Sequence, residues 1–247
     1  MMRLHFIACR ILTRELSWFC ANSPFPTEIT WMPQGLHAEP GRLQKELART
    51  ISMVEEQSRE ERQRFFPDYL VLGYGLCSNG VVGLEAGEIP LVIPRTDDCI
   101  GLMLGSQKRY LELFDQNPGT YWFSHNWQEH AAVPSRKAME QRRAFYAEQY
   151  GEENADFLLE QDLLWTTQYR HAGLIASPLF DNRTAEETAR SFAEENGWDF
   201  FQVPGDNRIF SMMAKGQWEK EDFLVCPPHH RVEAAYDGSK LKAVPVG

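Results

Sequence analysis

The stretch YLVLGYGLCSNG, residues 69–80, consists of an apolar segment followed by a short loop. The loop contains a cysteine and a glycine. Its beginning, YLVLGYG, is a continuous apolar run of the kind found in parallel strands that are covered on both faces. The run IPLVIP at residues 89–94 has the same character, and LHFIA at residues 4–8 gives a third example. These segments predict neighbouring strands of one parallel sheet.

Strand and helix signals alternate along the rest of the chain. Apolar residues spaced three or four apart predict an amphipathic helix over residues 40–61. Further strands are expected at EITWMP (28–33), TYWF (120–123), AGLIAS (172–177), WDFFQVPG (198–205) and FLVC (223–226). This alternation favours an α/β fold with a three-layer, doubly wound parallel sheet and helices on both faces.

No linker, repeat or low-complexity segment divides the chain, so we expect one α/β domain over residues 1–247. Residues 134–168 are charged and helical in pattern, and are expected to form a helical insertion. Gly151 is expected to separate two helices within that insertion.

Composition and charge exclude several classes of protein. The net charge of −10 repels phosphate backbones, so we expect no nucleic-acid partner. No apolar run approaches the length of a membrane span, and the first apolar run is too short for a signal peptide. Five cysteines, an odd number in a long chain, do not suggest a secreted disulfide framework. A cytoplasmic location is therefore expected.

Three of the cysteines follow predicted strands. Cys9 comes directly after LHFIA, Cys77 comes shortly after YLVLGYG, and Cys99 follows LVIP after four residues. Because the carboxyl ends of parallel strands share one edge of a sheet, we expect these three thiols to converge there.

Three convergent thiols suit either zinc or a [4Fe–4S] cluster, each with one coordination position left open. Cysteines are also common as small buried apolar residues, and that reading stays open for these three. It is the expected role of Cys20 and Cys226, although Cys226 follows a strand and is a candidate fourth ligand.

The loops around the thiols offer further candidates. Gly73, Gly75 and Gly80 would let backbone approach a bound cofactor closely, although no G-x-G-x-x-G motif is present. Asp98 is a candidate general base or a helix cap, and Arg95 could hold an anionic substrate or make a surface ion pair.

Histidine and aromatic residues give weaker signals. His230 is the preferred candidate for proton transfer or as a fourth ligand. The segment TYWF and nearby Trp127 could form a cage for a methylated ammonium group, or simply fill the core as a strand. Tyr74 and Trp122 are therefore candidate substrate-binding residues. Asn79 is a further candidate.

The strings LGYGLCSNGVVGLEA, LVIPRTDDCIGLMLGSQKRY and NPGTYW, with the late FLVCPP, resemble the DUF1638 family. The resemblance spans most of the chain. Members are often encoded near corrinoid-dependent methyltransferases that act on methylated amines. The resemblance therefore implies a link to one-carbon metabolism, with a methylated amine as a candidate substrate and a corrinoid or methyltransferase protein as a candidate partner.

Three hypotheses follow for function. The first is a metalloenzyme that uses Cys9, Cys77 and Cys99 to bind zinc or a [4Fe–4S] cluster. The second is a non-catalytic accessory or metal-delivery protein for a corrinoid methyltransferase system. The third is a metal-free redox or nucleophilic enzyme in which a cysteine reacts directly.

Overall fold

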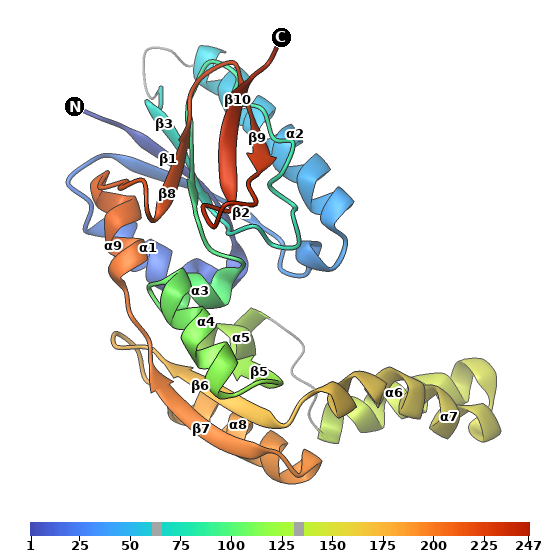
Figure 1. Ribbon diagram of the computed structural model, residues 1–247. Coiled ribbons are helices and arrows are strands. Elements are labelled where there is room, and N and C mark those ends of the chain that lie inside the picture. The colour runs from blue at the N-terminus through green and yellow to red at the C-terminus, as the bar shows by residue number, and fades with distance from the viewer. Residues whose placement is uncertain (61–65, 131–135) are drawn as a thin grey trace. The chain divides into compact units, whose positions relative to one another are not determined.

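The computed structural model describes residues 1–60, 66–130 and 136–247, and these form two compact units (Figure 1). Unit 1 comprises Met1–Tyr110 and Asp206–Gly247, and unit 2 comprises Leu111–Gly205. The sequence carries no composition change at either boundary, which is why one domain over residues 1–247 is expected from it. Whether the two units unfold as one domain stays a prediction.

Unit 1 is built on a five-stranded sheet with the strand order β2-β1-β3-β4-β8. The strands are β1 (Leu4–Cys9), β2 (Thr27–Met32), β3 (Tyr69–Gly73), β4 (Leu91–Pro94) and β8 (Phe223–Cys226). Strands β2, β1, β3 and β4 run parallel to one another, and β8 runs antiparallel to β4. A separate antiparallel hairpin contains β9 (His230–Ala234) and β10 (Leu241–Pro245).

The three apolar runs that predict a parallel sheet are confirmed as its central strands. All six residues of β1 are buried, as are all four of β4. The expectation that FLVC adds another parallel strand is wrong, because Cys226 pairs with Leu91 and Phe223 pairs with Pro94. A short apolar run has the same pattern in either direction, so its sequence could not reveal this.

The helices of unit 1 connect these strands. They are η1 (Arg10–Leu12), α1 (Thr13–Ala21), η2 (Leu36–Ala38), α2 (Pro40–Glu60), α3 (Cys99–Met103), α9 (Arg208–Lys215) and the first part of α4 (Gln107–Gln116). The predicted amphipathic helix over residues 40–61 is α2 as far as Glu60, and Glu61 lies outside the described residues. The helix buries Leu43, Leu47, Ile51 and Val54, as the spacing indicates. Across the described residues, no helix is both long and apolar enough to cross a membrane.

Unit 2 has its own parallel sheet, in the order β5-β6-β7. Its elements are β5 (Thr120–Phe123), α5 (His125–His130), α6 (Arg136–Tyr150), α7 (Glu152–Leu163), η3 (Leu164–Gln168), β6 (His171–Ala176), α8 (Arg183–Asn196) and β7 (Asp199–Pro204). The parallel strands are thus divided between two sheets. As expected, Gly151 separates two helices in the insertion, with a φ of +86° that suits glycine.

The TYWF segment lies in the hydrophobic core of unit 2. The Tyr121 ring packs against Trp165 at 5.1 Å and Tyr169 at 5.3 Å between centroids. On the other side of the strand, Trp122 is buried and lies 5.6 Å from Phe201. These contacts support the core-strand interpretation of TYWF over a substrate cage.

Candidate three-cysteine site

The strand order places a topological switch point between β1 and β3. The chain leaves β1 toward β2 on one side and leaves β3 toward β4 on the other. Connections that diverge in this way open a crevice at the carboxyl ends of the two strands, where ligands bind in open α/β sheets. Cys9 is the last residue of β1, and Tyr74 directly follows β3.

The three predicted thiols influence one another electrostatically. Burial raises the pKa of Cys99 well above its usual value, and the neighbouring Asp98, Cys77 and Cys9 raise it further. Burial, then Asp98, raises the pKa of Cys77 to about 12, with Cys9 adding to the effect. Groups that shift one another's pKa lie in the same region of unit 1, whereas the convergence of the three thiols on one site stays a prediction.

All three thiols influence the pKa of Tyr74. Its side chain is 3% exposed, and its hydroxyl makes no hydrogen bond of standard geometry within the described part of the chain. The hydroxyl nevertheless faces Cys9 closely enough to lower the pKa of that thiol, which burial raises overall. Burial, followed by the charges of Cys9 and Cys77, raises the pKa of Tyr74 itself. A buried hydroxyl that lacks a good partner is a feature of binding sites.

The loop after β3 has an unusual backbone. Cys77, Ser78 and Asn79 have φ angles of 45°, 58° and 67°, in the left-handed region that costs a non-glycine residue about 1 kcal/mol or more. The loop is held by hydrogen bonds from the Leu76 N–H to the Thr96 carbonyl and from the Cys77 N–H to the Asp97 carbonyl, at 2.8 and 2.7 Å. Backbone strain of this kind gathers at functional sites. Asn79, a candidate substrate-binding residue, is exposed on this loop.

The three predicted cofactor-binding glycines have a packing explanation in the structure. A Cβ on Gly75 would lie 2.4 Å from the Thr96 carbonyl oxygen. On Gly73 it would lie 2.5 Å from the Ala8 Cβ, and on Gly80 it would lie 2.4 Å from Leu43. These glycines let the strands, loops and α2 approach one another closely. Contact with a cofactor stays a prediction.

Asp98 caps α3, the alternative that the sequence leaves open beside a role as general base. Its Oδ1 accepts hydrogen bonds from the N–H groups of Ile100 and Gly101, and its Oδ2 accepts one from the Tyr110 hydroxyl at 3.2 Å. Burial raises the pKa of Asp98, although these hydrogen bonds oppose the effect. Both carboxylate oxygens therefore have donors in this structure.

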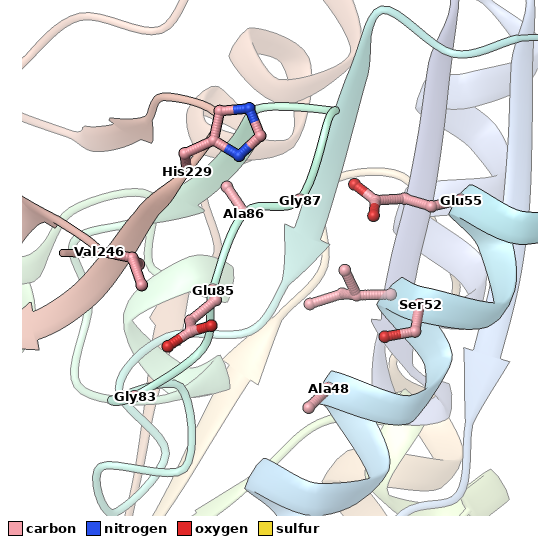
Figure 2. A pocket seen from close by; sticks show the side chains of 10 residues that line it. Ala48, Ser52, Glu55, Gly83, Glu85, Ala86, Gly87, His229 and Val246 are labelled. Carbon is pink, nitrogen blue, oxygen red and sulfur yellow. The ribbon is translucent and has the colours of Figure 1, made fainter.

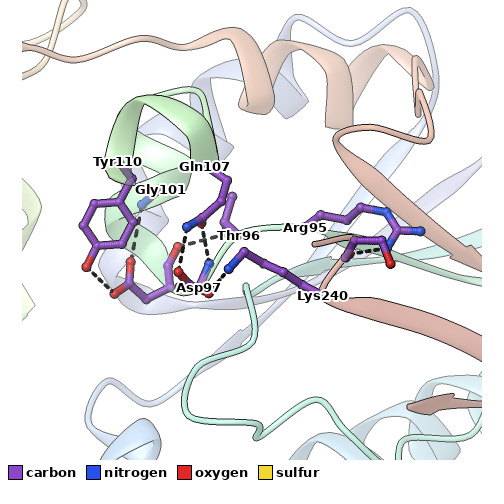
Figure 3. A network of polar contacts seen from close by, with 9 residues as sticks. Arg95, Thr96, Asp97, Gly101, Gln107, Tyr110 and Lys240 are labelled. Carbon is purple, nitrogen blue, oxygen red and sulfur yellow. Dashed lines mark hydrogen bonds and ion pairs between the residues drawn. The ribbon is translucent and has the colours of Figure 1, made fainter. Parts of the chain in front are cut away.

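A polar network joins the β4 loop to α4 and to the C-terminal hairpin (Figure 3). The Asp97 carboxylate accepts a hydrogen bond from Gln107 at 2.6 Å and pairs with the Lys240 ammonium. Gln107 in turn accepts from the Asp97 N–H at 2.8 Å. These partners come from distant parts of the sequence, and no motif in the sequence points to them.

Arg95 is engaged with backbone and not with a substrate site. Its guanidinium donates to the carbonyl oxygens of Phe223, Ser239 and Leu241. Burial lowers the pKa of Arg95, and the charge of Asp237 opposes that shift. Through these hydrogen bonds, Arg95 attaches the β9–β10 hairpin to the end of β4.

The structure does not bring His230 to the thiols. Because β8 is antiparallel, it ends at Cys226 opposite Leu91, where β4 begins. His230 follows that end, and its Nδ1 contacts the Pro228 carbonyl at 2.9 Å. Cys226 and His230 therefore lie toward the amino ends of the parallel strands. If FLVC formed a parallel strand, they would instead lie at the carboxyl ends.

Metal-binding geometry was expected at the three thiols. Within residues 1–60, 66–130 and 136–247, no three His, Cys, Asp or Glu side chains form a group that could hold a metal ion as they stand. All five cysteines are free. As they stand, the three thiols therefore do not form a metal-binding group.

Residues 31–214 match a family described as a protein of unknown function, DUF1638. The chain belongs to this family. The match contains Cys77, Cys99 and the loops around them, whereas Cys9 precedes it. No curated protein and no solved structure matches the chain. For this DUF1638 protein, the chemistry must be argued from the site itself.

The raised thiol pKa values predict that the metal-free protein loses stability at high pH. A thiol in the unfolded chain loses its proton near pH 9, whereas Cys77 in the folded chain does so near pH 12. The stabilisation is complete below about pH 9 and is lost between about pH 9 and 12, by up to ~1.4 kcal/mol per pH unit. Urea unfolding across this range should show a decline that is shallower in Cys77→Ala. Equal slopes in both proteins would contradict the buried, protonated thiol.

Proposed function

We propose that this DUF1638 protein is a metal-dependent enzyme whose Cys9, Cys77 and Cys99 hold an inorganic centre with one open coordination position. The observation that carries the proposal is the electrostatic influence that Cys9, at the end of β1, and Cys77, after the other switch-point strand β3, exert on Cys99 after β4. Cys9 and Cys77 are buried and Cys99 is half-buried. The buried Tyr74 hydroxyl, which faces Cys9 and makes no hydrogen bond of standard geometry among the described residues, provides a polar group for a ligand bound there.

The charges around the thiols favour a metal over direct cysteine chemistry. Reactive cysteines need a cation or a helix terminus that lowers the thiol pKa. Here burial and the Asp98 carboxylate raise the pKa of Cys77 and Cys99. A bound cationic centre would reverse this balance, because metal binding displaces the thiol protons. Cys99 does begin α3, and a backbone hydrogen bond there lowers its pKa, but burial and the Asp98 charge outweigh this effect and leave the pKa raised.

The arrangement of the thiols favours a [4Fe–4S] cluster over a single zinc ion. Zn–S bonds of about 2.3 Å require three sulfur atoms to gather tightly around one point. The thiols interact, but they do not form such a group. A cluster spreads its cysteine ligands over separate iron atoms and so needs wider spacing. With three cysteine ligands, its fourth iron would be open to a small molecule.

The proposal also includes the finer arrangement expected from the sequence, a doubly wound sheet with helices on both faces. Right-handed connections support it, because the chain crosses from β1 to β2 in one direction and from β2 to β3 in the other. With right-handed crossovers, α1 and α2 would lie on opposite faces and would leave the carboxyl edge of the strands open for a ligand.

The test is metal analysis of protein purified without oxygen. We expect about four iron and four sulfide per chain, with brown colour and absorption near ~400 nm that bleaches on reduction. Colourless protein with one zinc per chain would keep a metal site but replace the cluster. Protein free of both metals after reconstitution with iron and sulfide, and after incubation with zinc, would refute the proposal.

A second candidate function is that of an accessory or metal-delivery protein for a corrinoid methyltransferase system, and one feature favours docking on a protein partner. The α6–α7 pair exposes Phe145, Tyr150 and Phe157, which are 49%, 58% and 59% accessible. Turnover of a methylated amine by the purified protein alone would exclude the purely accessory role. The methylated amine and a cytoplasmic location remain parts of the proposal, the latter supported by five free cysteines.

A further inference from the structure

A second candidate site lies in unit 1, in a groove of about 620 Å³ between α2 and the segment Gly83–Gly87 (Figure 2). This volume is in the range of small-molecule sites. One wall is formed by α2, and His229 lies opposite. The groove borders Ile89, which precedes β4, so it lies toward the amino ends of the parallel strands and apart from the thiols.

Glu55 provides a buried negative charge in this groove. Its side chain extends from α2 toward Gly87 (Figure 2), and the residue is only 8% exposed. One oxygen accepts a hydrogen bond from the Ile89 N–H at 3.0 Å. The other carboxylate oxygen lies 2.1 Å from the position that a Cβ on residue 87 would occupy. The absence of a side chain at Gly87 therefore makes room for the Glu55 carboxylate. No cation pairs with Glu55 among the described residues, although buried charges are normally paired.

The rest of the groove presents mainly hydrogen-bond acceptors. The side chains of Ser52, Glu85 and His229 line it and make no hydrogen bond or ion pair with other described residues. A carboxylate only accepts, and a neutral imidazole accepts at one nitrogen. The position of His229 is set by its backbone, with φ +59° and an N–H that donates to the Ala86 carbonyl at 2.8 Å. Such a set of groups complements a ligand that is positively charged and rich in N–H donors.

We propose that this groove binds a small primary ammonium or guanidinium ligand, with Glu55 as its ion-pair partner and Glu85 and His229 as further acceptors. A quaternary ammonium ion fits less well because it has no N–H donor. In addition, none of the described lining residues is the Phe, Tyr or Trp that would form a cation–π contact. This ligand would be distinct from any molecule bound at the cysteines.

Calorimetric titration with two probes, 1,4-diaminobutane and agmatine, tests the assignment. Wild-type protein should bind at least one of them saturably, and tetramethylammonium should bind much more weakly. Glu55→Gln should weaken binding roughly tenfold or more, since a charge-assisted hydrogen bond in a buried site is lost. Glu56→Gln is the matched control, because it removes the same charge from the next, exposed position of α2.

Each result decides the proposal. A loss in Glu55→Gln without a loss in Glu56→Gln supports it. Glu85→Gln changes an exposed position, so this variant should fold normally, and it should also bind the probes more weakly. If Glu55→Gln does not fold, the result for Glu85→Gln decides whether the proposal holds. The proposal is overturned by equal losses in the two α2 variants, by equal binding of tetramethylammonium, or by no saturable binding below about 10 mM. Metal content at the cysteines should not change in any of these variants.

Discussion

Replacing Cys99 by alanine is expected to remove the metal centre while leaving the fold intact. Cys99 begins α3 and is held beside Cys77 and Cys9, so its loss leaves two thiols where three are needed. Changing a residue that only hydrogen-bonds to a metal ligand already lowers metal affinity by about 10- to 100-fold. Removing a ligand itself should therefore lower metal affinity by roughly 100-fold or more. Metal content and the visible spectrum of anaerobically purified protein measure it.

Cys20→Ala is the matched control for this variant. Cys20 is buried, and burial raises its pKa to about 12, but it lies in α1 and none of the three thiols affects it. The two variants therefore remove the same kind of side chain, from a buried position at Cys20 and from a half-buried one at Cys99. Equal metal content in both, with unchanged circular dichroism, would mean that Cys99 is only a small core residue.

Replacing Gly75 by alanine should destabilise the protein by about 3 kcal/mol, the upper part of the usual range for overpacking. The added Cβ would lie 2.4 Å from the Thr96 carbonyl oxygen and 2.9 Å from the Asp98 nitrogen. Both are backbone atoms, so neither can rotate away, and the loop that carries Cys77 would have to separate from the β4 loop. Unfolding in urea measures the change in free energy.

Gly41→Ala provides the comparison, because nothing lies within 4 Å of a Cβ at that position in α2. Alanine favours helix over glycine by up to ~1 kcal/mol, so this variant should be as stable as the wild type or slightly more stable. If Gly75→Ala lost less than about 1 kcal/mol, close packing would not be the reason for a glycine there. Cysteine accessibility to a thiol reagent would show whether the Cys77 loop has moved.

Buried apolar runs were the most informative part of the sequence. They gave β1, β3 and β4 and therefore the edge at which Cys9, Cys77 and Cys99 gather. Such runs favour buried parallel strands, but a short run has the same pattern in an antiparallel strand and does not say which sheet the strand joins. That is why the antiparallel direction of β8 and the separate sheet of unit 2 could not be predicted.

Long-range polar contacts were equally hidden in the sequence. Lys240 reaches Asp97 across 143 positions of the chain, and no local spacing encodes that pair. Arg95 was interpreted by its charge alone, whereas its geometry is set by carbonyl groups that any residue would provide. The groove around Glu55 was missed for the same reason, since its walls come from three separate segments.

The division of unit 1 into two stretches of chain has a consequence for folding during synthesis. Residues 111–205 intervene between its parts, so unit 2 is complete on the ribosome before β8 exists. Domains generally fold as units and earlier ones fold first, which leaves the edge of β4 without a neighbour in the meantime. Arg95 receives its last carbonyl partner only when Leu241 emerges. An exposed strand edge during that interval is open to pairing with other chains, so the nascent protein depends on rapid completion or on a chaperone.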